Sequence, residues 1–298
     1  MNVPNAPEAA APHLVENVPG QRWRERKATF RPRGEGFDPS GYGVELIGKT
    51  EASNFITREH YSGSMPPTSV RVGLYRVVGR FLRAELVGVC TFGGFSSQEV
   101  APRWTGLPSS VVLQLSRLVL LDLVPYNFET WLLARAFTIL RAERPQVRAV
   151  ISYSDPVPRR NEQGVITMPG HMGAVYQAKG ARYVGRSDAE LKWLDQHGRL
   201  VDGRSLSKVR ALDRDDPVKS KGGASYARTL VELGADQRRP LETWTAWVER
   251  ITRGGEGPFR AMRHRGNHTY LFSPRGLGTP LPASVSPALP YPKAKDAA

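Results

Sequence analysis

The segment VVLQLSRLVLL at residues 111–121 decides the fold, because it predicts a strand relative to which the elements before and after it can be placed. It is too short to cross a membrane, and its Val and Leu content, interrupted by Ser116 and Arg117, is typical of a buried strand in a mixed sheet. Pro125 and Asn127 then signal the start of a helix. The helix is predicted from apolar residues at helical spacing, namely Trp131, Leu132, Ala136, Ile139 and Leu140.

A second strand, ISYSDP at 151–156, follows this helix. We predict one or two helical turns over 173–179, ended by Gly180, and then a strand that carries Tyr183. A strand that ends where a helix begins leaves backbone N–H groups that can bind phosphate or carboxylate. We therefore expect the active cleft at the end of the strand 111–121.

The residues before this region complete the sheet. A short strand is expected over 42–49, and a helix over 51–64 with Ser53 or Asn54 as its cap. Apolar residues alternate over 70–81 and 82–92, as in two antiparallel strands with Gly79 near the turn. The expected fold class is therefore α+β, with a mixed, mostly antiparallel central sheet flanked by helices.

Composition limits the functional classes. The formal charge of +14 and the pI near 10.2 favour attraction to nucleic acid. Cys90 is the single cysteine, which excludes an internal disulfide and a cysteine zinc site. No signal-peptide pattern or long apolar stretch occurs in the sequence. We expect no membrane partner and a cytoplasmic location.

Shifts in composition suggest four parts. Residues 1–36 are expected to be a mobile basic segment, and 37–198 the catalytic domain. Residues 199–272 are rich in Arg and Lys, and we expect a basic C-terminal extension packed on the core. Proline dominates 273–298, which predicts a disordered tail.

The order of elements resembles the GCN5-related N-acetyltransferase (GNAT) fold. Four sequence words are similar to the phage Mom-type adenine DNA-modification family: HYS at 60–62, SYSDP at 152–156, GHMGAVYQAKGARYVG at 170–185 and NHTYLF at 267–272. The resemblance covers about 53–272. It implies a transferase in the cytoplasm of the phage's host that attaches a small acyl-derived or glycinamide-like (carbamoylmethyl) group to adenine N6 and protects phage DNA from restriction.

Such chemistry requires a group that accepts the proton of a poorly nucleophilic amine. Asp155 is the first choice, although an Asp before a Pro is commonly a turn cap. His60, Tyr61 and Ser62 lie together at the end of a predicted helix, and the resemblance implies that they are catalytic residues. Ser116 completes the catalytic candidates. For each of them, a packing or capping role is the alternative.

Other side chains are candidates for binding the donor, a small molecule or a carrier-bound group. Arg117 would be costly to bury without an anionic partner, which could be Asp155, Asp122 or a ligand. The remaining donor-binding candidates are Tyr126, Asn127, His171, Tyr176 and Gln177.

The cofactor stays open. An acyl-CoA pyrophosphate is expected to need a glycine-rich loop, and 122–127 contains no glycine. No metal site is predicted from spacing, although His60, His171 and Asp155 have the ligand types of a two-His, one-carboxylate iron site.

Double-stranded DNA is the expected macromolecular partner. Basic residues assigned to its binding are Arg159, Arg160, Arg260, Arg263, Arg265 and His268. Two alternatives remain. One is an acetyl-CoA-dependent acetyltransferase acting on a protein or small amine, with an open seat for CoA at 122–130. The other is a nucleic-acid-binding protein without enzymatic activity.

Overall fold

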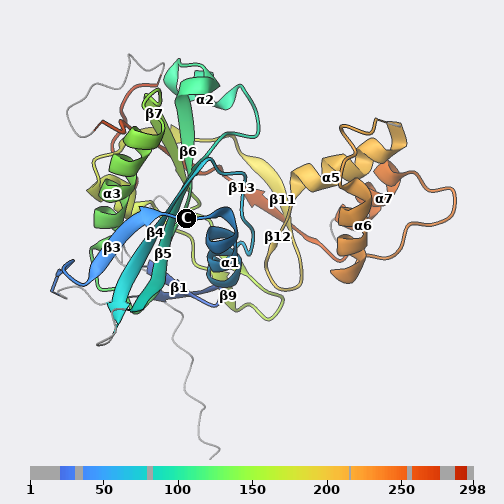
Figure 1. Cartoon of the computed structure of the whole chain (residues 1–298). Helices are drawn as coiled ribbons and strands as arrows, with labels where there is room; N and C mark the ends of the chain where they lie inside the picture. Colours follow the sequence, from blue (N-terminus) through green and yellow to red (C-terminus); the bar gives the residue numbers. More distant parts are fainter. Residues whose placement is uncertain are drawn as a thin grey trace, which may run out of the picture.

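The computed structural model describes residues 21–30, 36–78, 83–214, 216–253, 257–275 and 286–293. Its largest element is a seven-stranded sheet in the order β10-β14-β7-β6-β5-β4-β3 (Figure 1). The strands are β3 (Tyr42–Leu46), β4 (Val70–Val78), β5 (Arg83–Gly93), β6 (Val112–Leu120), β7 (Ala149–Ser154), β10 (Arg182–Arg186) and β14 (His268–Phe272). The mixed, mostly antiparallel sheet predicted from the sequence is therefore confirmed. The turn expected at Gly79 lies outside the described residues.

Strands β6 and β7 are the parallel pair of this sheet, and they diverge. Their register runs only from Val112 opposite Ala149 to Gln114 opposite Ile151. The remaining residues of β6, including Arg117, pair with β5 alone. Beyond Gln114 and Ile151, β6 and β7 are thus no longer paired with each other.

A β-bulge in β6 changes which residues face which side. Thr91 lies opposite Arg117 and Phe92 opposite Leu115, so Ser116 is the extra residue. Because a bulge shifts the faces by one residue, Ser116 and Arg117 do not follow the simple alternation of a regular strand. Arg117 points to the side of the sheet on which the chain after α1 lies.

Helices cover both faces of the sheet. Helix α3 (Phe128–Glu143) follows β6 as predicted, and its buried stripe includes Phe128, Leu132 and Ala136. With Tyr176 of the short α4 (Ala174–Ala178), it builds the largest apolar core. On the other face lie α1 (Lys49–Glu59) and α2 (Val100–Thr105), followed by η1 (Ser109–Val111). Helix α1 begins after Gly48, earlier than the predicted cap at Ser53 or Asn54.

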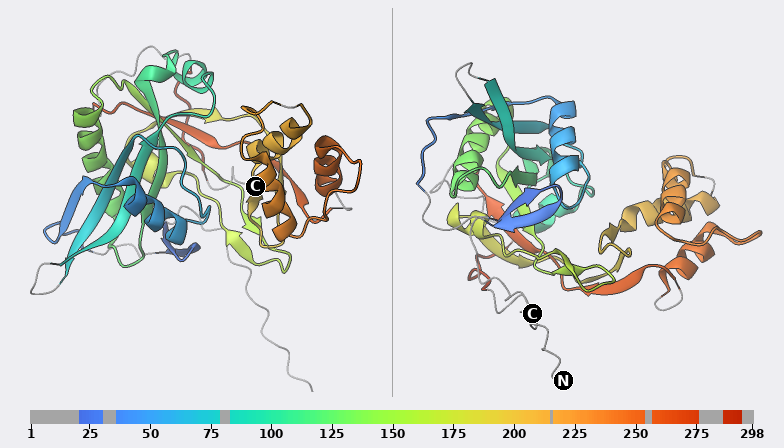
Figure 2. Two further views of the ribbon diagram at one scale, coloured as in Figure 1. Left: turned by 45° about the vertical axis from the view of Figure 1, so that its right-hand side comes forward. Right: turned by 90° about the horizontal axis from the view of Figure 1, so that it is seen from below.

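The C-terminal extension forms a lobe of its own rather than packing on the core as expected (Figure 2). Three short strands, β11 (Glu190–Leu194), β12 (Leu200–Val201) and β13 (Arg260–His264), form an arm that reaches from the sheet to the lobe. The helical elements are α5 (Gly203–Arg210), η2 (Ala211–Arg214), α6 (Gly223–Glu232) and α7 (Trp244–Thr252). They pack around Trp247 because the apolar residues of each helix fall on one side.

Two further segments differ from expectation. Within the part predicted to be mobile, β1 (Gln21–Arg24) and β2 (Lys27–Phe30) form an antiparallel hairpin, and residues 1–20 lie outside the described residues. Within the predicted tail, residues 286–293 run beside strand β10. There the Leu289 N–H donates to the carbonyl of Tyr183 at 2.9 Å. Between β7 and α4, residues 156–170 contain a small hairpin of β8 (Arg159–Arg160) and β9 (Ile166–Met168).

Candidate active site

Arg117 lies where β6 has left β7, and its guanidinium reaches the turn after α1. Nη2 is 3.1 Å from Ser62 Oγ and 3.2 Å from the carbonyl oxygen of Ser64, and Nη1 donates to the carbonyl of Ser116 at 2.8 Å. Its Nε is buried and has no hydrogen-bond acceptor. Burial lowers the pKa of this guanidinium, although the nearby Tyr61 and Tyr176 act in the opposite direction. Among the described residues, no carboxylate forms an ion pair with Arg117.

His60 is buried beside this guanidinium. Its Nδ1 accepts the backbone N–H of Ser62 at 3.2 Å and lies 2.8 Å from Ser62 Oγ. Because Nδ1 acts as an acceptor, the ring proton belongs on Nε2. Burial, followed by the charges of Arg117, His171 and Arg159, holds the pKa of His60 well below its usual value. The imidazole is therefore neutral, and the lone pair of its Nδ1 lies beside the Ser62 hydroxyl.

Asp155 lies at the end of β7 with its carboxylate fully engaged. Oδ1 is 2.9 Å from His264 Nε2 and accepts the Val157 N–H at 3.0 Å, while Oδ2 forms an ion pair with Arg159. Burial alone would raise the pKa of Asp155, but the hydrogen bond from His264 and the charge of Arg159 hold it well below its usual value. A carboxylate this acidic is a poor proton acceptor near neutral pH.

Tyr61 joins these two groups of residues. The Arg159 guanidinium carbon lies 5.5 Å from the centre of the Tyr61 ring, and the ring centres of Tyr61 and His60 are 4.1 Å apart. Burial raises the pKa of Tyr61, which also responds to the charges of Arg159, Asp155 and Arg117. Residues from distant segments of the sequence thus lie close together here.

His171 and Tyr176 border the same site. The backbone N–H of His171 donates to the carbonyl of Asp155 at 2.8 Å, and burial lowers the pKa of its ring. Burial raises the pKa of Tyr176 to about 12, and this phenol also responds to Tyr61 and Arg117. Gln177 instead turns inward, because its amide donates to the carbonyl of Met172 and to the hydroxyl of Tyr270.

Three predicted residues lie elsewhere. The Ser116 hydroxyl donates to the carbonyl of Gln114 at 3.3 Å within its own strand. Tyr126 and Asn127 stand at the start of α3, where Asn127 has a φ of 73°. The Ser116 hydroxyl is thus engaged within β6, and the carbonyl of Asn127 accepts the Thr130 hydroxyl at 2.9 Å.

The start of α3 does not fit an acyl-CoA pyrophosphate. Arg22 of β1 is fully buried there, where it donates to the carbonyl of Pro125 at 2.9 Å and pairs with Glu129 in the first turn of α3. The protein's own cation and carboxylate occupy the helix end that an anion would need. Arg22 and Glu129 thus lie at 122–130, where the acetyltransferase alternative requires an open seat for CoA.

The predicted DNA-binding residues separate into two groups. Arg160, Arg260, Arg263 and Arg265 are exposed. Arg159 is buried in its ion pair with Asp155, and His268 is buried with its Nδ1 2.8 Å from the Tyr183 hydroxyl. The surface assignment of these last two residues was wrong, because strand β14 and the loop after β7 turn them inward.

Metal-ligand residues do not gather into a group. Within the part of the chain that the structure describes, no three His, Cys, Asp or Glu side chains lie where one ion could bind them together. His60, His171 and Asp155 therefore do not form the three-ligand set considered from the sequence. The Asp155 carboxylate meets three protein donors instead, from Val157, Arg159 and His264.

Residues 41–229, more than half of the chain, match the model of the Mom protein family. The chain belongs to the Mom protein family. The Mom family is associated with phage DNA modification and with resistance to restriction. Across the described residues, no helix is both long and apolar enough to span a bilayer.

Other comparisons add little to the Mom assignment. No curated protein matches the sequence. Among solved structures, malonyl-CoA decarboxylase from Rhodopseudomonas palustris is similar with a TM-score of 0.32 and 14% identity. The match covers 81% of this chain and 61% of the decarboxylase, so the Mom-family chain spans less than two thirds of that protein. This similarity is too low to bear on activity.

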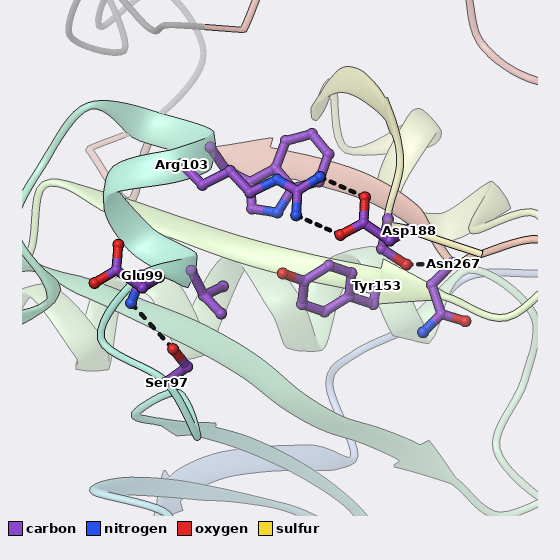
Figure 3. A pocket seen from close by; sticks show the side chains of 9 residues that line it. Ser97, Glu99, Arg103, Tyr153, Asp188 and Asn267 are labelled. Carbon is purple, nitrogen blue, oxygen red and sulfur yellow. Dashed lines mark hydrogen bonds and ion pairs between the residues drawn. The ribbon is translucent and has the colours of Figure 1, made fainter. Parts of the chain in front are cut away.

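A separate pocket lies beside α2 (Figure 3). Its volume is about 330 Å³, and Arg103 and Asp188 face each other across it in a two-fold hydrogen-bonded ion pair. Tyr153 contributes a wall from β7. None of the residues around Arg117 or Asp155 lines this pocket, so it is distinct from the candidate active site of the Mom-family chain.

Sequence reasoning missed His264 as a site residue. It stands in the Arg-rich stretch RAMRHRG at 260–266, which we interpreted as basic surface. It is nevertheless fully buried and donates to Asp155, 109 positions earlier in the chain. Nothing in the local sequence distinguishes it from its exposed neighbours.

Proposed function

We propose that this Mom-family protein attaches a small acyl-derived or glycinamide-like (carbamoylmethyl) group to adenine N6 in double-stranded DNA, and so protects phage DNA from restriction. The observation that carries this proposal is the position of Arg117. Its guanidinium is largely buried at the divergence of β6 and β7, beside a neutral His60 and a serine hydroxyl. Such a site supplies both an anion-stabilising group and a proton acceptor.

Arg117 is suited to stabilise negative charge on the donor. Burial of a cation without a carboxylate is costly, and the cost is relieved when an anion or a developing oxyanion binds. A fixed donor aimed at the charge that develops in the transition state typically contributes about 10²- to 10³-fold in rate. We assign this role to the Arg117 guanidinium, toward the carbonyl oxygen of the donor.

His60 and Ser62 are suited to remove the proton from N6. The Ser62 hydroxyl takes the N6 proton while it gives its own proton to Nδ1 of His60. When the transferred group is an acyl group, the bond between N6 and the donor's carbonyl carbon forms and the bond from that carbon to the leaving group breaks. When it is a carbamoylmethyl group, the bond from N6 forms to the methylene carbon next to the carbonyl, and the bond from that methylene carbon to the leaving group breaks. The leaving group keeps the electron pair and receives the proton from His60. The charge of Arg117 favours the deprotonated oxygen of Ser62 during this relay.

Asp155 has a different role in this proposal from the one expected. With both oxygens engaged, it holds Arg159 against the Tyr61 ring rather than accepting the N6 proton. Tyr61, His171 and Tyr176 then form the walls of the site. A buried target atom requires that the adenine be extruded from the duplex.

The exposed arginines near the arm are suited to the DNA backbone. Arg260 Nη2 donates to the backbone carbonyl of Arg160 at 2.8 Å, and the Arg160 guanidinium donates to the carbonyl of Gly164 at 2.8 Å. Among the described residues, neither forms an ion pair with a carboxylate. Replacing both with Gln should weaken DNA binding without changing kcat, and should reduce the slope of log affinity against log salt by about 1 per arginine.

Nucleoside mass spectrometry tests the function directly. DNA from cells that express the wild-type protein is digested and its adenine nucleosides are compared with those from cells expressing Arg117→Gln. We expect a heavier adenine nucleoside with the wild-type protein and its loss with Arg117→Gln. Arg103→Gln, which removes an exposed arginine beside the pocket of Figure 3, is the matched control and should leave the product unchanged. Unmodified adenine despite good expression of folded wild-type protein would contradict the proposal.

A further inference from the structure

His264 is the point at which the arm of the C-terminal lobe meets the candidate active site. It ends strand β13, its side chain is fully buried, and its Nε2 lies 2.9 Å from Asp155 Oδ1. Its other ring nitrogen, Nδ1, accepts the backbone N–H of Gly266 at 3.1 Å. Nδ1 therefore carries the lone pair, and the proton on Nε2 is donated to Asp155.

The turn after β13 fixes this orientation of the ring. Gly266 has a φ of 92°, and a Cβ atom added to it would lie 1.9 Å from the carbonyl oxygen of Ser187. Only glycine fits such a backbone conformation and such a close approach. The N–H that holds Nδ1 is thus set by the backbone, and the direction of the Nε2 proton follows from it.

From Asp155 the contacts continue to the proposed base. The second oxygen of Asp155 holds Arg159, whose guanidinium carbon lies 5.5 Å from the Tyr61 ring centre. The Tyr61 ring lies 4.1 Å from that of His60, centre to centre. Each member of this series is buried or half-buried, so a change in one position must be accommodated by the next.

From His264 the contacts also continue into the lobe. Strand β13 pairs with β11 along its whole length, and Trp193 of β11 donates from its indole N–H to the carbonyl of Thr252 in α7 at 2.9 Å. The lobe therefore determines where β11 and β13 lie. His264 also falls outside residues 41–229, the part that matches the family model.

We propose that His264 is a positioning residue for the modification reaction, and that through it the C-terminal lobe forms part of the active site. This inference rests on the proposed function. The Nε2–H group of His264 sets the rotation of the Asp155 carboxylate, which sets Arg159 and with it the face of Tyr61 beside His60. His264 does not touch the substrate in this scheme.

Three substitutions separate the hydrogen bond from the packing. His264→Phe keeps the ring volume and removes the donor. His264→Gln places an amide N–H near the position of Nε2, whereas the shorter His264→Asn does not reach Asp155. His197→Phe, at an exposed position in the turn between β11 and β12, is the matched control.

We expect kcat for DNA modification to fall by about 10- to 100-fold in His264→Phe and His264→Asn, with KM for DNA within about twofold of wild type. His264→Gln should recover most of kcat, and the control should equal wild type. Amide hydrogen exchange supplies a second measurement that does not depend on activity: residues 155–161 should exchange faster in His264→Phe and not in the control.

Wild-type kcat in His264→Phe with unchanged exchange at 155–161 would overturn the inference, as would a kcat in His264→Gln as low as in His264→Asn. If His264→Phe does not fold, the Gln and Asn pair decides by itself. A folded wild-type protein that modifies no DNA would count against the proposed function instead, while the exchange measurement would still test the link from His264 to Asp155.

Discussion

Two arginines at the candidate site, Arg117 and Arg159, differ in the kind of group that they bind. Arg159 is buried against the carboxylate of Asp155, which His264 also binds. Arg117 is partly buried against hydroxyl and carbonyl oxygens, and no carboxylate forms an ion pair with it among the described residues. A charge whose partner is built into the protein stabilises the fold, whereas a charge that lacks one is available to a ligand. Arg159 thus belongs to the structural framework of the site, whereas Arg117 is the arginine to which we assign a role in the reaction.

The structural role of Arg159 is tested most severely by replacing its partner, Asp155. Asp155→Ala leaves the buried guanidinium of Arg159 and the N–H of His264 without an acceptor, so unfolding in denaturant should become easier by about 3–5 kcal/mol. The free energy of unfolding of Asp195→Ala, which removes another buried carboxylate whose arginine partner is half-exposed, should fall by less. Equal stability of Asp155→Ala and wild type would remove the distinction between the two arginines.

The proposed reaction beside Arg117 is tested by replacing His60. His60→Phe keeps a ring against Tyr61 but removes the nitrogen that accepts the proton from Ser62. The rate of DNA modification should fall by about 10³-fold, the usual range for loss of a general base being 10² to 10⁴. Thermal melting verifies that the variant is folded. A variant with more than a tenth of the wild-type rate would exclude His60 as the base.

Arg117→Gln should separate activity from stability. The modification rate should fall by about 10²-fold because the developing oxyanion loses its donor. The melting temperature should stay the same or rise, since a largely buried charge without a carboxylate partner is removed. A strong loss of stability of Arg117→Gln in a denaturant titration would show that Arg117, like Arg159, stabilises the fold.

The pH dependence of stability offers the finest test. The pKa of His60 and that of His171 are lowered by burial, so below about 6.5 the unfolded chain binds protons that the folded protein does not. Stability should therefore decrease as the pH falls below this value. The decrease should be smaller in His60→Phe, as measured by melting temperatures between pH 7 and pH 5. An identical decrease in both proteins would show that His60 is not held neutral by the fold.

Much of the fold could be predicted because local patterns determine it. The apolar run at 111–121 and the helical spacing that follows it specify β6 and α3, and alternation specifies β4 and β5. The bulge at Ser116 could not be predicted, because it arises from the pairing of β6 with β5 rather than from the residues of β6 alone. The orientation of Arg117 depends on that bulge.

The candidate site was predictable in part. HYS at 60–62, Arg117 and Asp155 were named from the sequence, and the structure brings them together. Their partners were not named correctly, because each partner depends on tertiary contacts. Arg159 looks like a surface cation until the loop after β7 turns back on Asp155, and His264 meets Asp155 only after the chain has passed through the whole lobe.

The place of β14 in the sheet has a consequence for synthesis. Residues 268–272 form an interior strand between β7 and β10, although the lobe separates them from β10 in sequence. This layer can therefore close only after the lobe has been synthesised. A nascent chain that stops before residue 268 would expose the unpaired edge of β7.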